Sequence, residues 1–152
     1  MAEKDVLDEL DIKILKTFQE DARQSSREIA KKLNVATGTV YSRIKKLTES
    51  GIIKGYTAII EPTLVGFDLT VVTLMRIEPG YLVDVENEVA KLSNVCAVYD
   101  ITGEFDAVFI ARFKNRAALN YFIKSVLKIP HLRGMVTSVV LNVVKEEHRV
   151  DL

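Results

Sequence analysis

The stretch "NVATGTVYSRIKKLTESGIIKGY", residues 34–56, combines a helical apolar pattern with small, hydroxyl-bearing and basic side chains. Val40, Ile44 and Leu47 recur at the spacing of one helix face, and they predict a helix that packs this face into a core. Gly51 supplies the stop signal of a helix C-terminus. The residues left on or beside the outward face are Gly38, Thr39, Tyr41, Ser42, Lys45 and Lys46.

Two further helical patterns precede this one. Residues 7–21 place Leu7, Leu10, Ile14 and Phe18 on one face, with Asp8 in the position of an N-cap. In the second helix, Ser25 and Glu28 form a capping box, and the apolar residues are Ile29, Ala30 and Leu33. Only a few residues separate the second helix from the third, which is the spacing of a helix-turn-helix. Residues 52–60, "IIKGYTAII", predict a strand that would complete a small winged arrangement.

Charge is distributed unevenly along a chain whose formal net charge is zero. Residues 1–21 hold three basic and seven acidic groups, whereas residues 22–55 hold eight basic and two acidic groups. The rest of the chain, residues 56–152, is mildly acidic. A basic surface is therefore expected only in the segment that contains the helix-turn-helix.

Such a motif places its second helix in the major groove of double-stranded DNA, where lysines neutralise phosphates. A glycine costs about 1 kcal/mol relative to alanine inside a helix, so Gly38 indicates close approach to another molecule. Arg43 lies nearer the apolar face and is interpreted as a phosphate contact or an internal brace. A solvated three-helix domain, or one that docks a protein, is the alternative. The candidate DNA-contacting residues are Ser25, Arg27, Thr37, Gly38, Thr39, Tyr41, Ser42, Arg43, Lys45 and Lys46.

A second domain is predicted after the break at "EPTLVGF", residues 61–67. Strand, helix and strand patterns occupy residues 68–77, 82–92 and 96–102, and the order repeats over 106–113, 116–128 and 135–144. This order predicts an α+β chain whose second half is a ferredoxin-like βαββαβ domain. The predicted domains are residues 1–60 and 68–152, joined by a linker over 61–67.

The first strand of that domain is apolar on both faces, because Val72 and Leu74 alternate with Val71, Thr73 and Met75. Helices cover one face in this fold, so the other face requires a partner. The sequence therefore predicts an obligate homodimer formed through the second domain.

Other features bound the class of protein. No apolar run approaches the length of a membrane span, and the acidic first residues do not resemble an export signal, so a cytoplasmic location is expected. The lone Cys96 lies in the apolar run "NVCAVYDIT" and predicts a buried strand thiol rather than a nucleophile. No metal cluster, nucleophile–base pair or phosphate loop is present, and neither a metal nor a cofactor is expected.

The sequence resembles the leucine-responsive regulatory protein/AsnC, or feast/famine, family of prokaryotic transcription regulators. The resemblance rests on "LDELDIKIL" at 7–15, "DAR" at 21–23, "VYSRIKKLTESGIIKGYTAII" at 40–60 and "TGEFD" at 102–106. It implies a winged helix-turn-helix joined to a ligand-sensing domain, dimers that assemble to octamers, and control by a small effector, often an amino acid. Ala36 departs from the hydroxyl or acidic cap with which many relatives begin the recognition helix, and Thr37 is the alternative cap.

The stretch "DITGEFD", residues 100–106, is the candidate effector site. A free amino acid needs acceptors for its ammonium and donors for its carboxylate, and this stretch offers carboxylates, a hydroxyl and free backbone N–H groups. A plain polar hairpin is the alternative on the residues alone, while the resemblance places effectors near this turn, at an interface between dimers. The candidate residues are Asp100, Thr102, Gly103, Glu104 and Asp106, with Thr137 and Ser138 as weaker candidates.

Two other functions remain open. Some proteins that resemble this family are tetrapyrrole decarboxylases, but His131 and His148 are both expected at the surface rather than in an acid–base role. An RNA-binding sheet ranks last, because the basic and aromatic signature strand of such modules is missing. The expected function is therefore that of a regulator and not of an enzyme.

Overall fold

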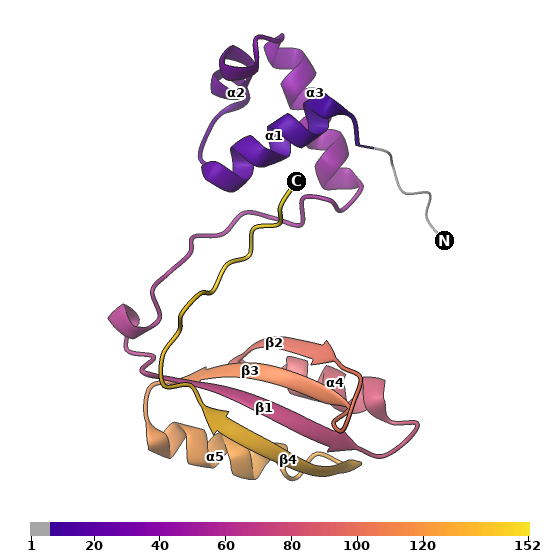
Figure 1. The fold of residues 1–152 in the computed structure, drawn as a ribbon, viewed down its shortest axis with the longest axis vertical. Coiled ribbons are helices and arrows are strands. Elements are labelled where there is room, and N and C mark those ends of the chain that lie inside the picture. Colours follow the sequence, from indigo (N-terminus) through magenta and orange to yellow (C-terminus); the bar gives the residue numbers. More distant parts are fainter. Residues whose placement is uncertain (1–6) are drawn as a thin grey trace. The chain divides into compact units, whose positions relative to one another are not determined.

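The computed structural model describes residues 7–152, so residues 1–6, which open the first predicted domain, lie outside the described part. The chain divides into two compact units. One unit contains the residues up to Ile59 together with Glu146–Leu152, and the other contains Ile60–Lys145. The last seven residues, which the sequence pattern groups with the second domain, therefore pack with the first (Figure 1).

Three helices form the first unit: α1 (Glu9–Glu20), α2 (Ser26–Leu33) and α3 (Thr37–Glu49). The caps predicted for the first two helices are confirmed. Asp8 and Asp11 bond reciprocally at the start of α1, and Ser25 and Glu28 do the same at the start of α2. Asn34 ends α2 in the left-handed conformation, at φ 54°, which turns the chain into α3 within a few residues.

The core of this unit forms where the apolar faces of the three helices meet. Ile14 of α1, Ile29 of α2 and Val40 of α3 are each fully buried, and Leu47 extends the contact along α3. Because α3 uses this face for packing, its opposite face is left exposed, as the spacing of its apolar residues predicts.

Two predictions for the first unit are wrong. Ala36 is the N-cap of α3 and makes no side-chain cap, while Thr37 is the first residue of the helix and does not cap it. Residues 54–60 are irregular rather than a strand, and Ile59 is 87% exposed. A strand needs a neighbour to satisfy its backbone groups, and no other described segment of this chain pairs with these residues.

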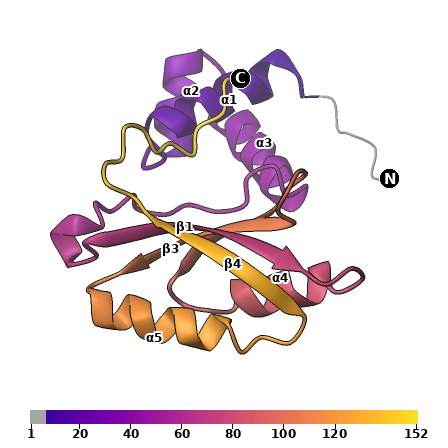
Figure 2. The same cartoon turned by 60° about the horizontal axis from the view of Figure 1, so that its bottom comes forward.

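The second unit is a four-stranded antiparallel sheet with strand order β2-β3-β1-β4. Its elements follow the predicted βαββαβ order, which confirms the ferredoxin-like arrangement. In both views, the two helices cover the same face of the sheet (Figures 1 and 2). The elements are β1 (Leu69–Ile77), α4 (Leu82–Ala90), β2 (Val95–Asp100), β3 (Ala107–Phe113), α5 (Arg116–Val126) and β4 (Leu132–Val139).

The two faces of this sheet differ in burial. Val71 and Met75 of β1 are fully buried beneath the helices, in a core that also contains Phe109 of β3 and Phe122 of α5. On the opposite face, which we call the open face, the alternate residues of the same strands are only half-buried or exposed, and Val136 of β4 is 51% exposed. β4 ends at Val139, so the strand predicted to run to residue 144 is five residues too long.

Cys96 is exposed, so the predicted buried thiol is wrong. The physical reason lies in β2, which is an edge strand whose register against β3 shifts between Val95 and Ala97. Cys96 sits at this irregularity, and its sulfur accepts a hydrogen bond from Arg112 Nη1 at 3.5 Å. Within residues 7–152, no helix has the length and apolar character that crossing a membrane would need.

Candidate nucleic-acid interface and effector turn

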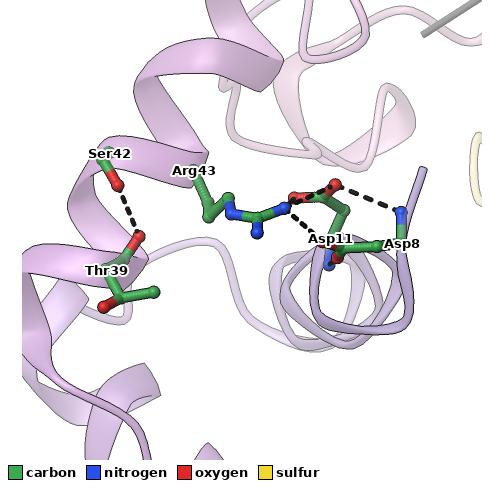
Figure 3. Close-up of polar contacts among 5 residues, drawn as sticks. All are labelled: Asp8, Asp11, Thr39, Ser42 and Arg43. Carbon is green, nitrogen blue, oxygen red and sulfur yellow. Dashed lines mark hydrogen bonds and ion pairs between the residues drawn. The ribbon is translucent and has the colours of Figure 1, made fainter. Parts of the chain in front are cut away.

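The outward face of α3 is accessible over its first two turns. The side chains of Thr39, Tyr41, Ser42 and Lys45 are all exposed, and Tyr41 is 65% exposed. Ser42 Oγ donates to the carbonyl oxygen of Thr39 at 2.9 Å, which leaves its lone pairs directed outward (Figure 3). Apart from its chain neighbours and the backbone of its own helix, no atom of residues 7–152 lies within 4 Å of the place where a Cβ of Gly38 would lie, so packing among these residues does not require this glycine.

The start of α2 extends this face. Arg27 and Lys31 are exposed and, with Thr37, line a shallow hollow of about 420 Å³ between α2 and the first turn of α3. Ser25 is exposed as well, but its hydroxyl donates to Glu28 at 2.7 Å and accepts from the Glu28 N–H. Ser25 therefore serves first as the cap of α2, whereas Arg27 is available to another molecule. Lys31 was not among the predicted DNA-contacting residues, although its place one helical turn after Arg27 indicates that both lie on the same face.

Arg43 points away from this face and into the protein. Its Nη1 bonds to the carboxylate of Asp8 and lies 3.1 Å from Asp11 Oδ2, and Asp11 is only 5% exposed (Figure 3). The Asp11 N–H, and next the Arg43 guanidinium, hold the pKa of Asp8 below its ordinary value. Of the two interpretations left open for Arg43, the structure therefore supports the internal brace.

Carboxylates around the interface are bonded to basic residues other than Arg27 and Lys31. Glu20 bonds to Lys32 Nζ at 2.8 Å, and Asp21 bonds to Arg23 Nε at 2.9 Å. The Arg23 guanidinium, followed by the Arg23 N–H, lowers the pKa of Asp21 to about 2. These two acids therefore offset the charges of Lys32 and Arg23 rather than those of Arg27 and Lys31.

The second candidate site is the turn between β2 and β3. Glu104 forms an ion pair with Arg76 of β1, whose guanidinium lies 4.9 Å from the centre of the Phe105 ring. Asp106 Oδ2 accepts a hydrogen bond from the N–H of Ile77 at 2.7 Å. These contacts join the turn to the end of β1 and fix its position on the sheet.

The predicted effector residues do not all meet. Asp100, Thr102, Gly103 and Glu104 are exposed within the same turn, whereas Asp106 is half-buried and bonded to the backbone. Thr137 and Ser138 of β4 are adjacent in the strand, so they point to opposite faces of the sheet. Thr137 lies on the helix-covered face with its hydroxyl 3.0 Å from that of Thr73, and Ser138 lies on the open face.

Two charged residues near this turn were not among the predicted effector-binding residues. Arg76 is the one charged residue of β1, an otherwise uncharged strand, and this isolated charge was the available sequence signal. Glu86 of α4 carries an oxygen without a hydrogen-bond partner, and desolvation, followed by the nearby Asp100, raises its pKa. No sequence signal separated Glu86 from the other acids of its helix.

The two histidines lie outside these sites. His131 is exposed and stacks on Tyr81, with ring centres 3.5 Å apart, while its Nδ1 lies 3.1 Å from Glu78. His148 is exposed in an irregular segment. In the part of the chain that the structure describes, no group of three or more His, Cys, Asp or Glu side chains could hold a metal.

A helix-turn-helix with an exposed basic face, joined to a ferredoxin-like unit, defines a class of protein that binds DNA with one domain and senses a ligand with the other. Comparison with known families agrees with this class. Residues 7–54 match the winged helix-turn-helix DNA-binding domain, and residues 70–150 match the Lrp/AsnC ligand binding domain. The chain belongs to the Lrp/AsnC family of transcriptional regulators.

Individual relatives support this assignment. An uncharacterized HTH-type transcriptional regulator of Pyrococcus abyssi is 47% identical over 146 residues, which cover 96% of this chain and 99% of that protein. The HTH-type transcriptional regulator FL11 of Pyrococcus horikoshii is 39% identical over 140 residues, covering 92% and 93%. A transcriptional regulator of Neisseria meningitidis, solved as an L-Met complex, superposes with a TM-score of 0.85 at 26% identity and covers 96% and 97%. These relatives are named as transcriptional regulators, so they do not support the alternative of a tetrapyrrole decarboxylase.

Proposed function

We propose that this regulator is a homodimer that reads double-stranded DNA with the outward face of α3 and changes its assembly or DNA binding when an amino acid occupies the turn at residues 100–106. The observation that carries the DNA-binding part is the division of basic residues in the first unit. Arg43 is bonded to Asp8 and Asp11, whereas Arg27 and the start of α3 face the solvent.

The small residues of α3 support contact with the major groove. Gly38 and Ser42 are exposed and present little bulk, so the helix backbone can approach base edges closely. Arg27 of α2 and Lys45 of α3 are exposed, and in this proposal they contact phosphates of the DNA backbone. In this arrangement Ser42 and Thr39 contact bases, while the basic residues give affinity without sequence preference.

Two observations support the amino-acid effector. The turn presents the Asp100 and Glu104 carboxylates, which suit an ammonium, beside Arg76, which suits a carboxylate. The related Neisseria regulator was solved with L-Met, which makes an amino acid the first ligand class to test. In this proposal an incoming carboxylate competes with Glu104 for the Arg76 guanidinium.

The open face of the sheet supports the dimer. Val72, Leu74 and Val136 are apolar and cross-strand neighbours, and no helix of their own unit covers them. A second copy would bury this face through a two-fold axis and would pair two α3 helices on one duplex. Two such helices predict a roughly palindromic site with half-sites about one helical turn, or a multiple of it, apart. Assembly of dimers to octamers stays a prediction from the family resemblance.

The response to effector then follows from linkage. A ligand that binds one assembly state more tightly than another shifts the protein toward that state, and with it the spacing of the recognition helices. A regulator of this kind acts where the chromosome lies, so we place it in the cytoplasm.

The test is a fluorescence-anisotropy titration of the full chain on the duplex upstream of its own gene and on a scrambled duplex, with and without pooled amino acids. We expect tighter binding to the first duplex and a shift of that binding by the pool. Equal binding to both duplexes would overturn the DNA-reading proposal. Specific binding that ignores every amino acid would overturn the effector proposal alone.

A further inference from the structure

The residues Glu146–Leu152 are attached to α1 by a specific contact. Both ends of the Gln19 side-chain amide bond to the backbone of Val150. The N–H of Val150 donates to Gln19 Oε1 at 2.8 Å, and Gln19 Nε2 donates to the carbonyl oxygen of Val150 at 3.0 Å. This reciprocal exchange is the pattern of a hydrogen-bonded pair in an antiparallel sheet, made here by one side chain.

An apolar contact accompanies these two hydrogen bonds. Leu152 is half-buried against the core cluster of the first unit, to which Ile14, Ile29 and Val40 belong. The residues leading to this point behave differently, since Leu141 is 98% and Val144 is 91% exposed. The contacts at Val150 and Leu152 thus hold the end of this segment, which belongs to the first unit and lies beside its helices (Figure 2).

This attachment changes how the two units are connected. The chain leaves the first unit at Ile59 and returns to it at Glu146, six residues after Val140 of the ligand-binding unit. Both crossings are irregular in structure. Two units joined by one irregular linker move freely relative to each other, whereas a second connection restricts the orientations that they can adopt.

We propose that Glu146–Leu152 is a strap that docks on α1 through Gln19 of the same chain and, while docked, limits the orientations of the DNA-binding unit. The hydrogen bonds between Gln19 and Val150 and the contact of half-buried Leu152 can open without unfolding either unit. Opening leaves only the linker near Ile59 and widens the range of orientations. This inference does not depend on the identity of the effector or of the DNA site.

Docking is measured first by amide hydrogen exchange of Val150 in the full chain, using selective ¹⁵N-valine labelling. Gln19→Leu keeps the size of the side chain and removes both hydrogen bonds, so we expect the Val150 amide to exchange about tenfold faster. Lys16→Leu, at an exposed position on the same helix, is the matched control and is expected to leave exchange unchanged. Equal exchange in the parent and Gln19→Leu chains would overturn the proposed docking.

A second variant acts on the strap rather than on its receptor. Val150→Pro removes the N–H donor in a segment without secondary structure, so folding of the helices does not depend on it. We expect the remaining amides of the strap, such as that of Asp151, to lose protection in this variant. Unchanged protection would overturn the role of the Val150 backbone.

Mixing distinguishes a strap within one chain from an exchange between two copies. Gln19→Leu chains, which keep the strap, are refolded together with chains that end at Lys145, which keep Gln19. Within one chain neither partner can form the contact, so no protected Val150 amide is expected. Protection restored by mixing would overturn the intramolecular strap and assign the contact to a second copy.

The effect on orientation is measured by the width of the distance distribution between spin labels. Labels are placed at Ser50→Cys and Asn120→Cys in a Cys96→Ser chain, diluted with unlabelled chains so that only intrachain distances are counted. All three positions are exposed. We expect a broader distribution when Gln19→Leu is added and no change with Lys16→Leu. Equal widths would overturn the restriction of orientation.

Discussion

Arg43 and Lys45 lie two residues apart on α3, but they have different ionic partners and therefore different expected roles. The Arg43 guanidinium is bonded to Asp8 and to the nearly buried Asp11, whereas Lys45 is exposed and forms an ion pair with Glu49 of its own helix at 3.7 Å. The net benefit of an exposed pair such as Lys45–Glu49 is small, so Lys45 can exchange that partner for a phosphate. If Arg43 turned to a phosphate instead, the nearly buried Asp11 carboxylate would lose the positive charge of the guanidinium.

Replacing Arg43 should therefore reduce the stability of the first unit. In Arg43→Met the aliphatic stem is kept and the guanidinium is lost, so we expect a lower free energy of unfolding, seen as a lower midpoint of urea unfolding. The expected loss is below that for a fully buried pair because the Arg43 side chain is 35% exposed. Lys45→Met is the matched control and should change stability by less than about 0.5 kcal/mol. Equal losses in the two variants would contradict the brace.

Lys45 and Ser42 should affect DNA binding in different ways. If Lys45 contacts a phosphate, as proposed, Lys45→Ala should weaken binding to specific and random duplexes alike and lower the salt slope by about 1. Ser42→Ala removes an outward hydroxyl, so we expect a change of preference of about 1 kcal/mol at one base pair. Anisotropy titrations over a series of salt concentrations and base substitutions measure both. The same loss on specific and random DNA for both variants would refute this assignment of roles.

Asp21 provides a prediction about pH. Its pKa is lowered from 3.8 to about 2, first by the Arg23 side chain and then by the Arg23 N–H. Because the folded pKa is depressed, the contribution of this pair to stability is complete above the unfolded pKa and is lost as the pH falls through the folded pKa. We expect the Asp21 carboxyl to titrate near 2 by NMR, and Arg23→Ala to move the midpoint toward 3.8. A midpoint near 3.8 in the parent chain would disprove the pairing in solution.

At Gly38, in the first turn of α3, one substitution is expected to have opposite effects on stability and on DNA binding. Apart from its chain neighbours and its own helix backbone, a Cβ at Gly38 would meet no atom of residues 7–152 within 4 Å, and the residue is not in the left-handed region. Gly38→Ala should therefore raise the free energy of unfolding by about 0.5 to 1 kcal/mol, because alanine favours the helix. If the helix backbone approaches DNA here, the same change should weaken specific binding, as measured by anisotropy. Stabilisation without a loss of binding would remove Gly38 from the interface.

The elements that the sequence predicted correctly are those with a local physical cause. Reciprocal caps at Asp8 and Ser25 begin α1 and α2, and apolar spacing sets the buried faces of α3 and β1. The errors arise where the outcome depends on a neighbour. Residues 54–60 have strand composition but no partner strand within the chain, and Cys96 falls at a register shift that no local pattern indicates.

The same distinction holds for the candidate sites. Exposed positions on α3 follow from its apolar face, so they could be predicted from periodicity alone. The effector turn depends on strands far apart in sequence, and Arg76 reaches Glu104 only because β1 lies next to β3. The contact between Gln19 and Val150 joins residues that are 131 positions apart, beyond the reach of any local signal.

At the scale of the whole molecule, the proposed dimer would bring two DNA-binding units to one duplex. A single helix-turn-helix reads one half-site, so the proposed dimer is required for selective binding to a palindrome. In this proposal the open face of the sheet forms the dimer interface, since its apolar residues lie outside the core beneath α4 and α5. In a two-fold interface each substitution occurs twice, which makes this face a sensitive place to test assembly.

Val136→Glu places a carboxylate at the exposed centre of β4, opposite Leu74 across the strands. In a dimer formed through the open face, two such charges are buried without partners, so we expect monomers at micromolar concentration in sedimentation and at least about a hundredfold weaker binding to a two-half-site duplex. Tyr121→Glu, at a 76% exposed position on α5, is the matched control and should remain dimeric. A dimer that survives Val136→Glu but dissociates with Tyr121→Glu would place the interface on the helix layer. Retained affinity in a monomeric Val136→Glu chain would mean that one recognition helix is sufficient.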